Sequence, residues 1–159
     1  MTEKSYIQML EESLYKKRDI LRSLQVLCHK QEEILLDEKA EADAFEKNVE
    51  QKAALIERLE KLDQGFEQVF SRVEEELQSN KELYKENILH MQECIREITE
   101  RSANLQILER QNMELAKKKF VSVRTQAKEL RQNSKVVSSY YQSMMKAKHD
   151  DPIFMDSKK

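Results

Sequence analysis

Two pairs of residues in this sequence combine side-chain types that bind zinc. Cys28 is followed directly by His29, and His90 precedes Cys94 by four positions, which places that second pair on one face of a helix. Adjacent helical residues point about 100° apart, so the first pair cannot easily face one site, and neither spacing is that of a zinc finger. We therefore expect no metal site and no cofactor, and we expect both cysteines to be small buried thiols.

The acidic residues do not indicate an active site either. They recur in runs such as Glu74, Glu75 and Glu76, or beside basic residues, as Glu82 does near Lys85. Such runs are typical of solvated helix faces that weak charge pairs support at spacings of three or four residues. No combination of nucleophile, base and orienting group stands out, so we expect that the protein is not an enzyme.

The scarcity of glycine and proline indicates which secondary structure carries these residues. Its 159 residues include one glycine, Gly65, and one proline, Pro152. Tight turns, β-hairpins and phosphate-binding loops depend on those two residue types, which argues against sandwiches, barrels and Rossmann folds. Charged residues make up 36% of the chain and apolar residues 39%, a balance that favours long helices with narrow apolar stripes.

Apolar residues at alternating spacings of three and four predict three helices. They extend over about 5–36, 44–78 and 81–148. The first stripe is interrupted only at Lys17 and Gln31. Stripes of this kind must be covered by one another, so we expect an all-α fold.

Two turns separate the predicted helices. The segment 37–43 loses the stripe, and Asp43 followed by Glu46 has the form of a helix start with a capping carboxylate. The poor helix formers of 78–80 predict a second turn or a kink. Gly65 falls within the second stripe, where we expect a small residue at a helix crossing, with a hinge as the alternative.

The third predicted helix is about twice as long as the other two, so we expect roughly thirty of its residues to protrude. The predicted fold is an elongated antiparallel helical hairpin or coiled coil of three long helices with a protruding C-terminal helix. Residues 1–148 would form one domain, followed by a disordered tail over 149–159. An unpaired apolar stripe is typical of a surface that binds a partner helix. The candidate partner-binding residues are Phe120, Val123, Leu130, Val137, Tyr140, Tyr141 and Met144.

The same protruding region is strongly basic. Segment 116–148 contains nine basic residues and one acidic residue, in a chain whose net charge is −2. A basic amphipathic helix could also bind an anionic membrane surface or nucleic acid. The apolar repeat continues through the basic stretch itself, which is unlike a DNA-binding basic region that leads into a zipper. We favour protein binding; the alternative is a self-associating structural coiled coil, such as a homodimer.

No apolar run approaches the roughly 20 residues of a membrane span. The polar N-terminal sequence also lacks the apolar core of a secretory signal. We expect a cytoplasmic protein with reduced cysteines and no integral membrane segment.

Segments 6–21 and 45–66 resemble the FlgN family of flagellar export chaperones, and the run 52–63 is the most distinctive part of the likeness. The resemblance implies a cytoplasmic chaperone. It would bind the helical ends of hook-filament junction proteins like FlgK and FlgL and deliver them to an export gate like FlhA. It also implies that the C-terminal helix binds the substrate and that a nearby tyrosine, here Tyr140 or Tyr141, engages the gate.

Overall fold

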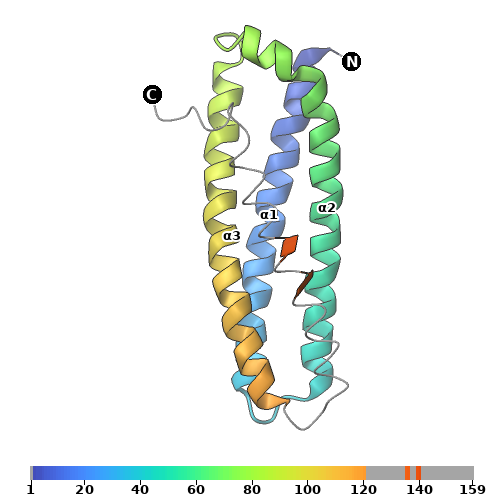
Figure 1. Cartoon of the computed structure of the whole chain (residues 1–159), viewed down its shortest axis with the longest axis vertical. Helices are drawn as coiled ribbons and strands as arrows, with labels where there is room; N and C mark the ends of the chain where they lie inside the picture. The colour runs from blue at the N-terminus through green and yellow to red at the C-terminus, as the bar shows by residue number, and fades with distance from the viewer. Residues whose placement is uncertain (1, 121–134, 137–138, 141–159) are drawn as a thin grey trace.

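The computed structural model describes residues 2–120, 135–136 and 139–140. Three helices account for most of them: α1 (Glu3–Leu36), α2 (Ala42–Ser79) and α3 (Lys85–Lys119) (Figure 1). The described residues contain no strand, so the predicted all-α fold is confirmed. The three helices lie side by side along the long axis of the molecule, with α1 between α2 and α3 in the view of Figure 1.

Contacts between the helices define their directions. Lys17 of α1 pairs with Asp63 of α2, and the later Gln31 pairs with the earlier Lys52, so α1 and α2 are antiparallel. On α1 and α3 the residue numbers of contacting partners increase in the same direction. The earlier residue Leu14 accepts from Cys94, and the later residue Cys28 donates to Glu109. The chain therefore runs up and down along the bundle, and α1 and α3 are parallel.

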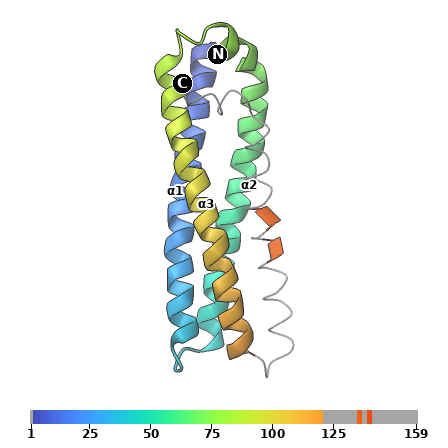
Figure 2. The same cartoon turned by 60° about the vertical axis from the view of Figure 1, so that its left-hand side comes forward.

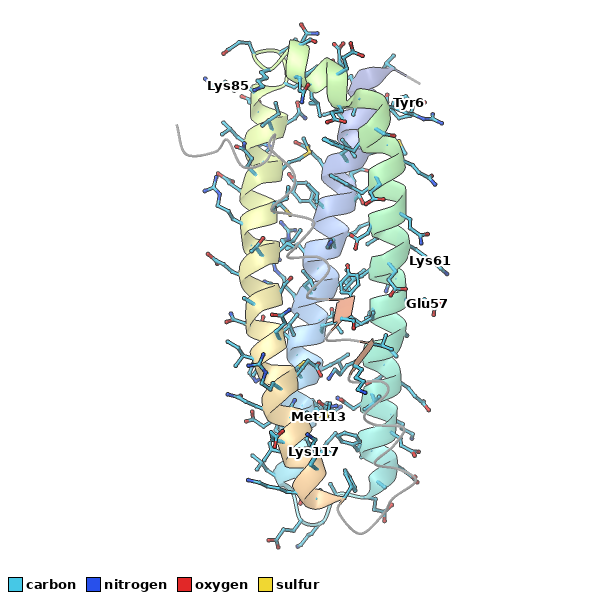
Figure 3. The ribbon with its side chains drawn as sticks, viewed as in Figure 1. Tyr6, Glu57, Lys61, Lys85, Met113 and Lys117 are labelled. Carbon is cyan, nitrogen blue, oxygen red and sulfur yellow. The ribbon has the colours of Figure 1, made fainter. Side chains whose placement is uncertain are left out.

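The apolar stripes form the core as predicted. Every apolar residue of the first stripe is buried, and so are most apolar residues of the second stripe and of the third stripe up to Phe120, where its continuous description ends. α1 packs extensively against both α2 and α3, which make little direct contact with each other. Charged side chains cover the outer faces, such as Glu57 and Lys61 on α2 (Figure 3). Burial of one face per helix thus explains the sequence period.

The connections agree with the predicted turns, although the caps differ. α1 ends at Leu36, and Glu41, which forms no side-chain cap hydrogen bond, is the N-cap of α2. The predicted cap at Asp43 is therefore wrong, because this residue already lies in the first turn, where its charge still suits the helix dipole. α2 ends at Ser79 with Asn80 as its C-cap, which confirms the second turn.

Gly65 does not lie at a helix crossing. The residue is exposed, and a Cβ atom added there would have no neighbour within 4 Å. Its φ angle is not positive, so the backbone does not require glycine. The predicted close helix approach at this position is wrong.

The third helix differs most from its prediction, because α3 ends at Lys119 and not near 148. Phe120 is the C-cap, with non-helical dihedral angles of −109° and 22°, and its ring packs on Phe45 with 5.4 Å between the centroids. Lys119 Nζ also donates to the carbonyl oxygens of Ile34 and Asp37, which ties the end of α3 to the end of α1. Packing at this end therefore stops a helix whose apolar period continues.

The expected protrusion beyond the bundle is also wrong where it can be checked. Tyr140 lies against the main core, and its hydroxyl group donates to Asp63 in the middle of α2. A helix continued straight from α3 would place Tyr140 about 30 Å beyond Phe120 at 1.5 Å per residue. Residues 135–136 and 139–140 lie instead beside α2, as Figure 2 shows. The predicted tail 149–159 lies outside the described residues.

Candidate protein-binding site

The residues considered for metal binding do not converge. Cys28 and Cys94 are free and buried, whereas His29 and His90 are exposed. Within the part of the chain that the structure describes, no group of three or more potential ligands could hold a metal ion. Burial raises the pKa of both thiols, that of Cys94 to about 11, so neither is a reactive thiolate in the folded protein.

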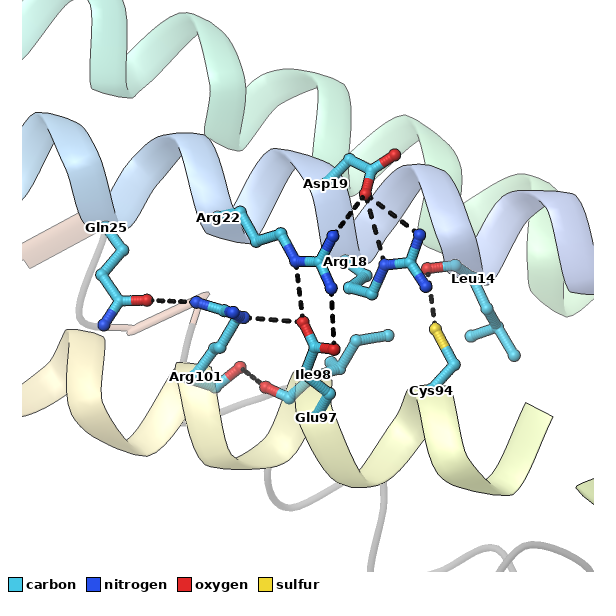
Figure 4. Close-up of polar contacts among 10 residues, drawn as sticks. Leu14, Arg18, Asp19, Arg22, Gln25, Cys94, Glu97, Ile98 and Arg101 are labelled. Carbon is cyan, nitrogen blue, oxygen red and sulfur yellow. Dashed lines mark hydrogen bonds and ion pairs between the residues drawn. The ribbon is translucent and has the colours of Figure 1, made fainter. Parts of the chain in front are cut away.

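The α1–α3 seam carries an ion-pair network on its outer side (Figure 4). Arg22 donates to both carboxylate oxygens of Glu97 at 2.9 and 3.0 Å, and Arg101 donates to the same carboxylate at 2.7 Å. Arg101 also donates to Gln25. The hydrogen bonds from Arg22 and then Arg101 lower the pKa of Glu97. These contacts link α1 to α3 and pair the Glu97 carboxylate with two guanidinium groups.

Phe120 is the first of the predicted partner-binding residues, and it is not available on the surface. Its side chain is 9% exposed and belongs to a small cluster with Leu35, Phe45 and Ala116. Tilted aromatic packing against Phe45 fills the end of the bundle. In this structure Phe120 therefore has a core role, which contradicts its predicted place on a free stripe.

Tyr140 is the second predicted residue that the structure describes, and it occupies a defined polar site. Its hydroxyl group donates to Asp63 Oδ2 at 2.6 Å, while Lys17 Nζ donates to Asp63 Oδ1 at 2.6 Å. The same ammonium group lies 5.8 Å from the centroid of the Tyr140 ring. One lysine from α1 and one aspartate from α2 thus hold an aromatic side chain on the surface of the bundle.

A surface pocket adjoins Tyr140. It is lined by Glu60 of α2 and by Lys135, Val136, Ser139 and Tyr140. Val136 is 56% exposed, so an apolar side chain lies open next to a carboxylate and an ammonium group. This mixture suits contact with a polar or amphipathic polypeptide and does not resemble a closed small-molecule site.

Val123, Leu130, Val137, Tyr141 and Met144, the other predicted residues, lie outside the described residues. Sequence reasoning missed Lys17 and Asp63, although each left a signal. Lys17 interrupts the apolar stripe of α1, and Asp63 ends the distinctive run 52–63. A charged residue at a stripe position is a candidate for a buried or half-buried polar contact.

These features define a class of protein: an elongated all-α bundle of three long helices, with a surface pocket beside Tyr140. Residues 1–148 match the family described as FlgN protein, so the chain belongs to the FlgN family. A search of curated proteins and a search of solved structures found no match. None of the described helices is long and apolar enough to cross a bilayer.

Membership of the FlgN family supports a general role as a flagellar export chaperone. It supports a role that is not enzymatic and implies the binding of flagellar substrate proteins. The family match extends over 121–148, the segment in which most of the predicted partner-binding residues lie.

Proposed function

We propose that this protein is a cytoplasmic chaperone for hook-filament junction proteins like FlgK and FlgL. It binds their helical ends, prevents premature assembly and delivers them to an export gate like FlhA. The match to the FlgN family across residues 1–148 is the observation that carries the proposal. Substrates kept unfolded for export expose apolar helix faces, and a bundle with apolar residues at its surface can shield them.

The partner-binding surface is proposed to involve the segment that contains Val137, Tyr140, Tyr141 and Met144. The contact of Tyr140 with Asp63 supports this placement, because it shows that the bundle surface accepts an aromatic side chain carried on a separate segment. Exposed Val136 beside it adds apolar surface. Phe120 is buried, so any contribution it makes is to the position of this segment and not to direct contact.

The test is capture of purified junction proteins by the full-length chaperone. Wild-type protein should retain both FlgK-like and FlgL-like substrates, and Val137→Asp should weaken retention at least tenfold, because a charge would enter an apolar contact. Val26→Asp is the matched control: this valine on α1 is 67% exposed and lies outside the proposed surface, so binding should be unchanged. Failure of the wild type to retain either substrate contradicts the proposal.

Delivery to the gate and self-association need separate measurements. Binding of the substrate-loaded chaperone to the cytoplasmic domain of an FlhA-like protein should be weaker for Tyr140→Ala or for Tyr141→Ala than for the wild type. If both variants bind as tightly as the wild type, the tyrosine role is excluded. A homodimer stays a prediction. Sedimentation of a concentration-independent monomer would exclude it and, with it, the structural coiled-coil alternative.

A further inference from the structure

A layer of polar side chains crosses the interior of the bundle. Its six members come from all three helices, and each is at most 7% exposed: Cys28, Gln31, Asn48, Lys52, Glu109 and Asn112. Lys52 of α2 forms a direct ion pair with Glu109 of α3 and donates to Gln31 of α1 at 3.1 Å. The layer therefore joins α2 directly to α3, although the backbones of these two helices make little close contact.

The layer is connected but incompletely satisfied. Cys28 Sγ donates to Glu109 at 2.9 Å, and Asn112 donates to Gln31 Oε1 at 3.0 Å and to the Cys28 carbonyl oxygen at 2.9 Å. Asn48 donates to the carbonyl oxygen of Leu27 at 2.9 Å. The side-chain oxygens of Asn48 and Asn112, however, are buried without a hydrogen-bond partner. Such groups gain hydration when the structure opens.

This layer divides the apolar core of the described residues into two parts. On one side lies the main cluster, which extends along the bundle from Ile7 to residues such as Ile56 and Leu105. On the other side lies an end cluster with four buried members, Leu35, Phe45, Ala116 and Phe120. The end cluster is small, so the apolar burial that holds it closed is a minor fraction of the total.

We propose that the end of the bundle beyond this layer opens as a unit while the main core stays folded. The unit, which we call the end module, comprises residues 32–48 and 112–120. Opening separates few apolar contacts and returns water to Lys52, Glu109 and the two asparagine oxygens, whereas opening the main core exposes a long apolar stripe. Regions with little apolar burial are those that open locally in native proteins.

The position of the end module gives its opening a consequence for the rest of the chain. Phe120 connects α3 to the residues that follow, and Lys119 is attached to α1 through the carbonyl oxygens of Ile34 and Asp37. Release of these contacts frees the start of the C-terminal segment without unfolding the bundle. The inference is independent of the proposed substrates, since it concerns only contacts within this chain.

The two cysteines lie at different distances from the end module within one molecule. Both belong to the main cluster, but Cys28, which is 0% exposed, also contacts Glu109 and Asn112 of the polar layer at the border of the end module, whereas Cys94, which is 5% exposed, contacts Leu14 far from that border. Wild-type full-length protein would be treated with a thiol reagent, and each cysteine would be followed by peptide mass spectrometry across low denaturant concentrations. If the end module opens locally, Cys28 should react at least tenfold faster than Cys94, with a weaker dependence on denaturant.

This order is the reverse of that expected from exposure alone. Equal rates with equal denaturant dependence would show that the bundle opens as one unit, and faster labelling of Cys94 would place the weak region elsewhere. Either result overturns the proposal.

A pair of variants tests the role of the layer itself. Lys52→Met with Glu109→Leu replaces the buried charges by apolar groups of similar size and joins the two clusters, so Cys28 labelling should slow at least tenfold. Lys61→Met with Glu57→Leu is the matched control, because that ion pair on α2 is exposed (Figure 3) and the labelling ratio should not change. An unchanged ratio in the buried-pair variant would exclude the layer as the cause of opening. If that variant does not fold, the wild-type ratio still decides the proposal.

Discussion

The buried Lys52–Glu109 pair supports a strong prediction about stability. The two side chains are 3% and 7% exposed, so replacement of one partner leaves a charge that water cannot reach. Lys52→Met should lower the free energy of unfolding by about 3–5 kcal/mol, because Glu109 would then keep only the Cys28 thiol as a partner among the contacts described here. Glu109→Leu should cost a similar amount, since the Lys52 ammonium group would lose its carboxylate and keep only uncharged partners, Gln31 and the Cys28 thiol.

The double variant should behave differently from the sum of the single variants. With both charges removed, the desolvation cost disappears and the space is filled by apolar groups, so its stability should lie near that of the wild type or up to about 4 kcal/mol above it. The coupling between the two substitutions should therefore be several kcal/mol. For the exposed Lys61–Glu57 pair, 75% and 70% exposed at 3.8 Å, the same cycle should give roughly 0.5 kcal/mol or less.

The assay is urea unfolding of the wild type, both single variants and the double variant, followed by circular dichroism at neutral pH. A single substitution at Lys52 that costs less than about 1 kcal/mol would refute the reasoning, since it would mean that water reaches Glu109 in the folded state. The reasoning would also be refuted if the double variant lost as much unfolding free energy as the two single variants lose together, because the two charges would then be uncoupled.

Three further outcomes follow from the described contacts. Gly65→Ala should raise the free energy of unfolding by about 0.5–1 kcal/mol in urea titrations, since the added methyl group meets nothing and glycine is a poor helix former; a loss of stability would contradict the open site. Glu97→Gln should lower stability at pH 7 by less than about 1 kcal/mol for this partly exposed carboxylate. Hydrogen bonds, chiefly from Arg22, lower the pKa of Glu97 from 4.5, so the stability that this carboxylate contributes is present above pH 4.5 and is lost as the pH falls through the lowered pKa. In thermal melts from pH 7 to pH 2, the difference in melting temperature between wild type and Glu97→Gln should therefore disappear at low pH. Tyr140→Phe removes the hydrogen bond to Asp63, which should weaken the attachment of residues 135–136 and 139–140 to the bundle by about 1 kcal/mol and speed tryptic cleavage at exposed Lys135 roughly fivefold. Unchanged cleavage would mean that the Tyr140 hydroxyl group does not hold these residues on the bundle.

The sequence by itself determined the fold class and most of the core. Near absence of glycine and proline left long helices as the architecture, and the spacing of apolar residues identified the buried face of each. The two turns could also be located, because the first stripe ends at Leu35 and poor helix formers gather at Gln78–Asn80. Local composition and periodicity are sufficient for these features since each depends on neighbouring residues alone.

Only the tertiary structure decided where α3 ends and where Tyr140 lies. The apolar period continues beyond Lys119, yet the packing of Phe120 on Phe45 and the contacts of Lys119 with the end of α1 stop the helix there. Phe45 is 75 positions away in the sequence, and no local pattern encodes that contact.

The sequence placed Cys28 and Gln31 on the buried face of the first helix, but it did not reveal the ion pair at the centre of the polar layer. Lys52 and Glu109 read as ordinary polar helix positions, and their burial became visible only when the partners of all three helices were brought to one level. A charge is tolerated in the interior only beside a partner of opposite charge, and that partner comes from a different helix. The sequence therefore determined which helix faces are buried, whereas the polar contacts within the bundle, the end of α3 and the position of Tyr140 depended on packing between distant segments.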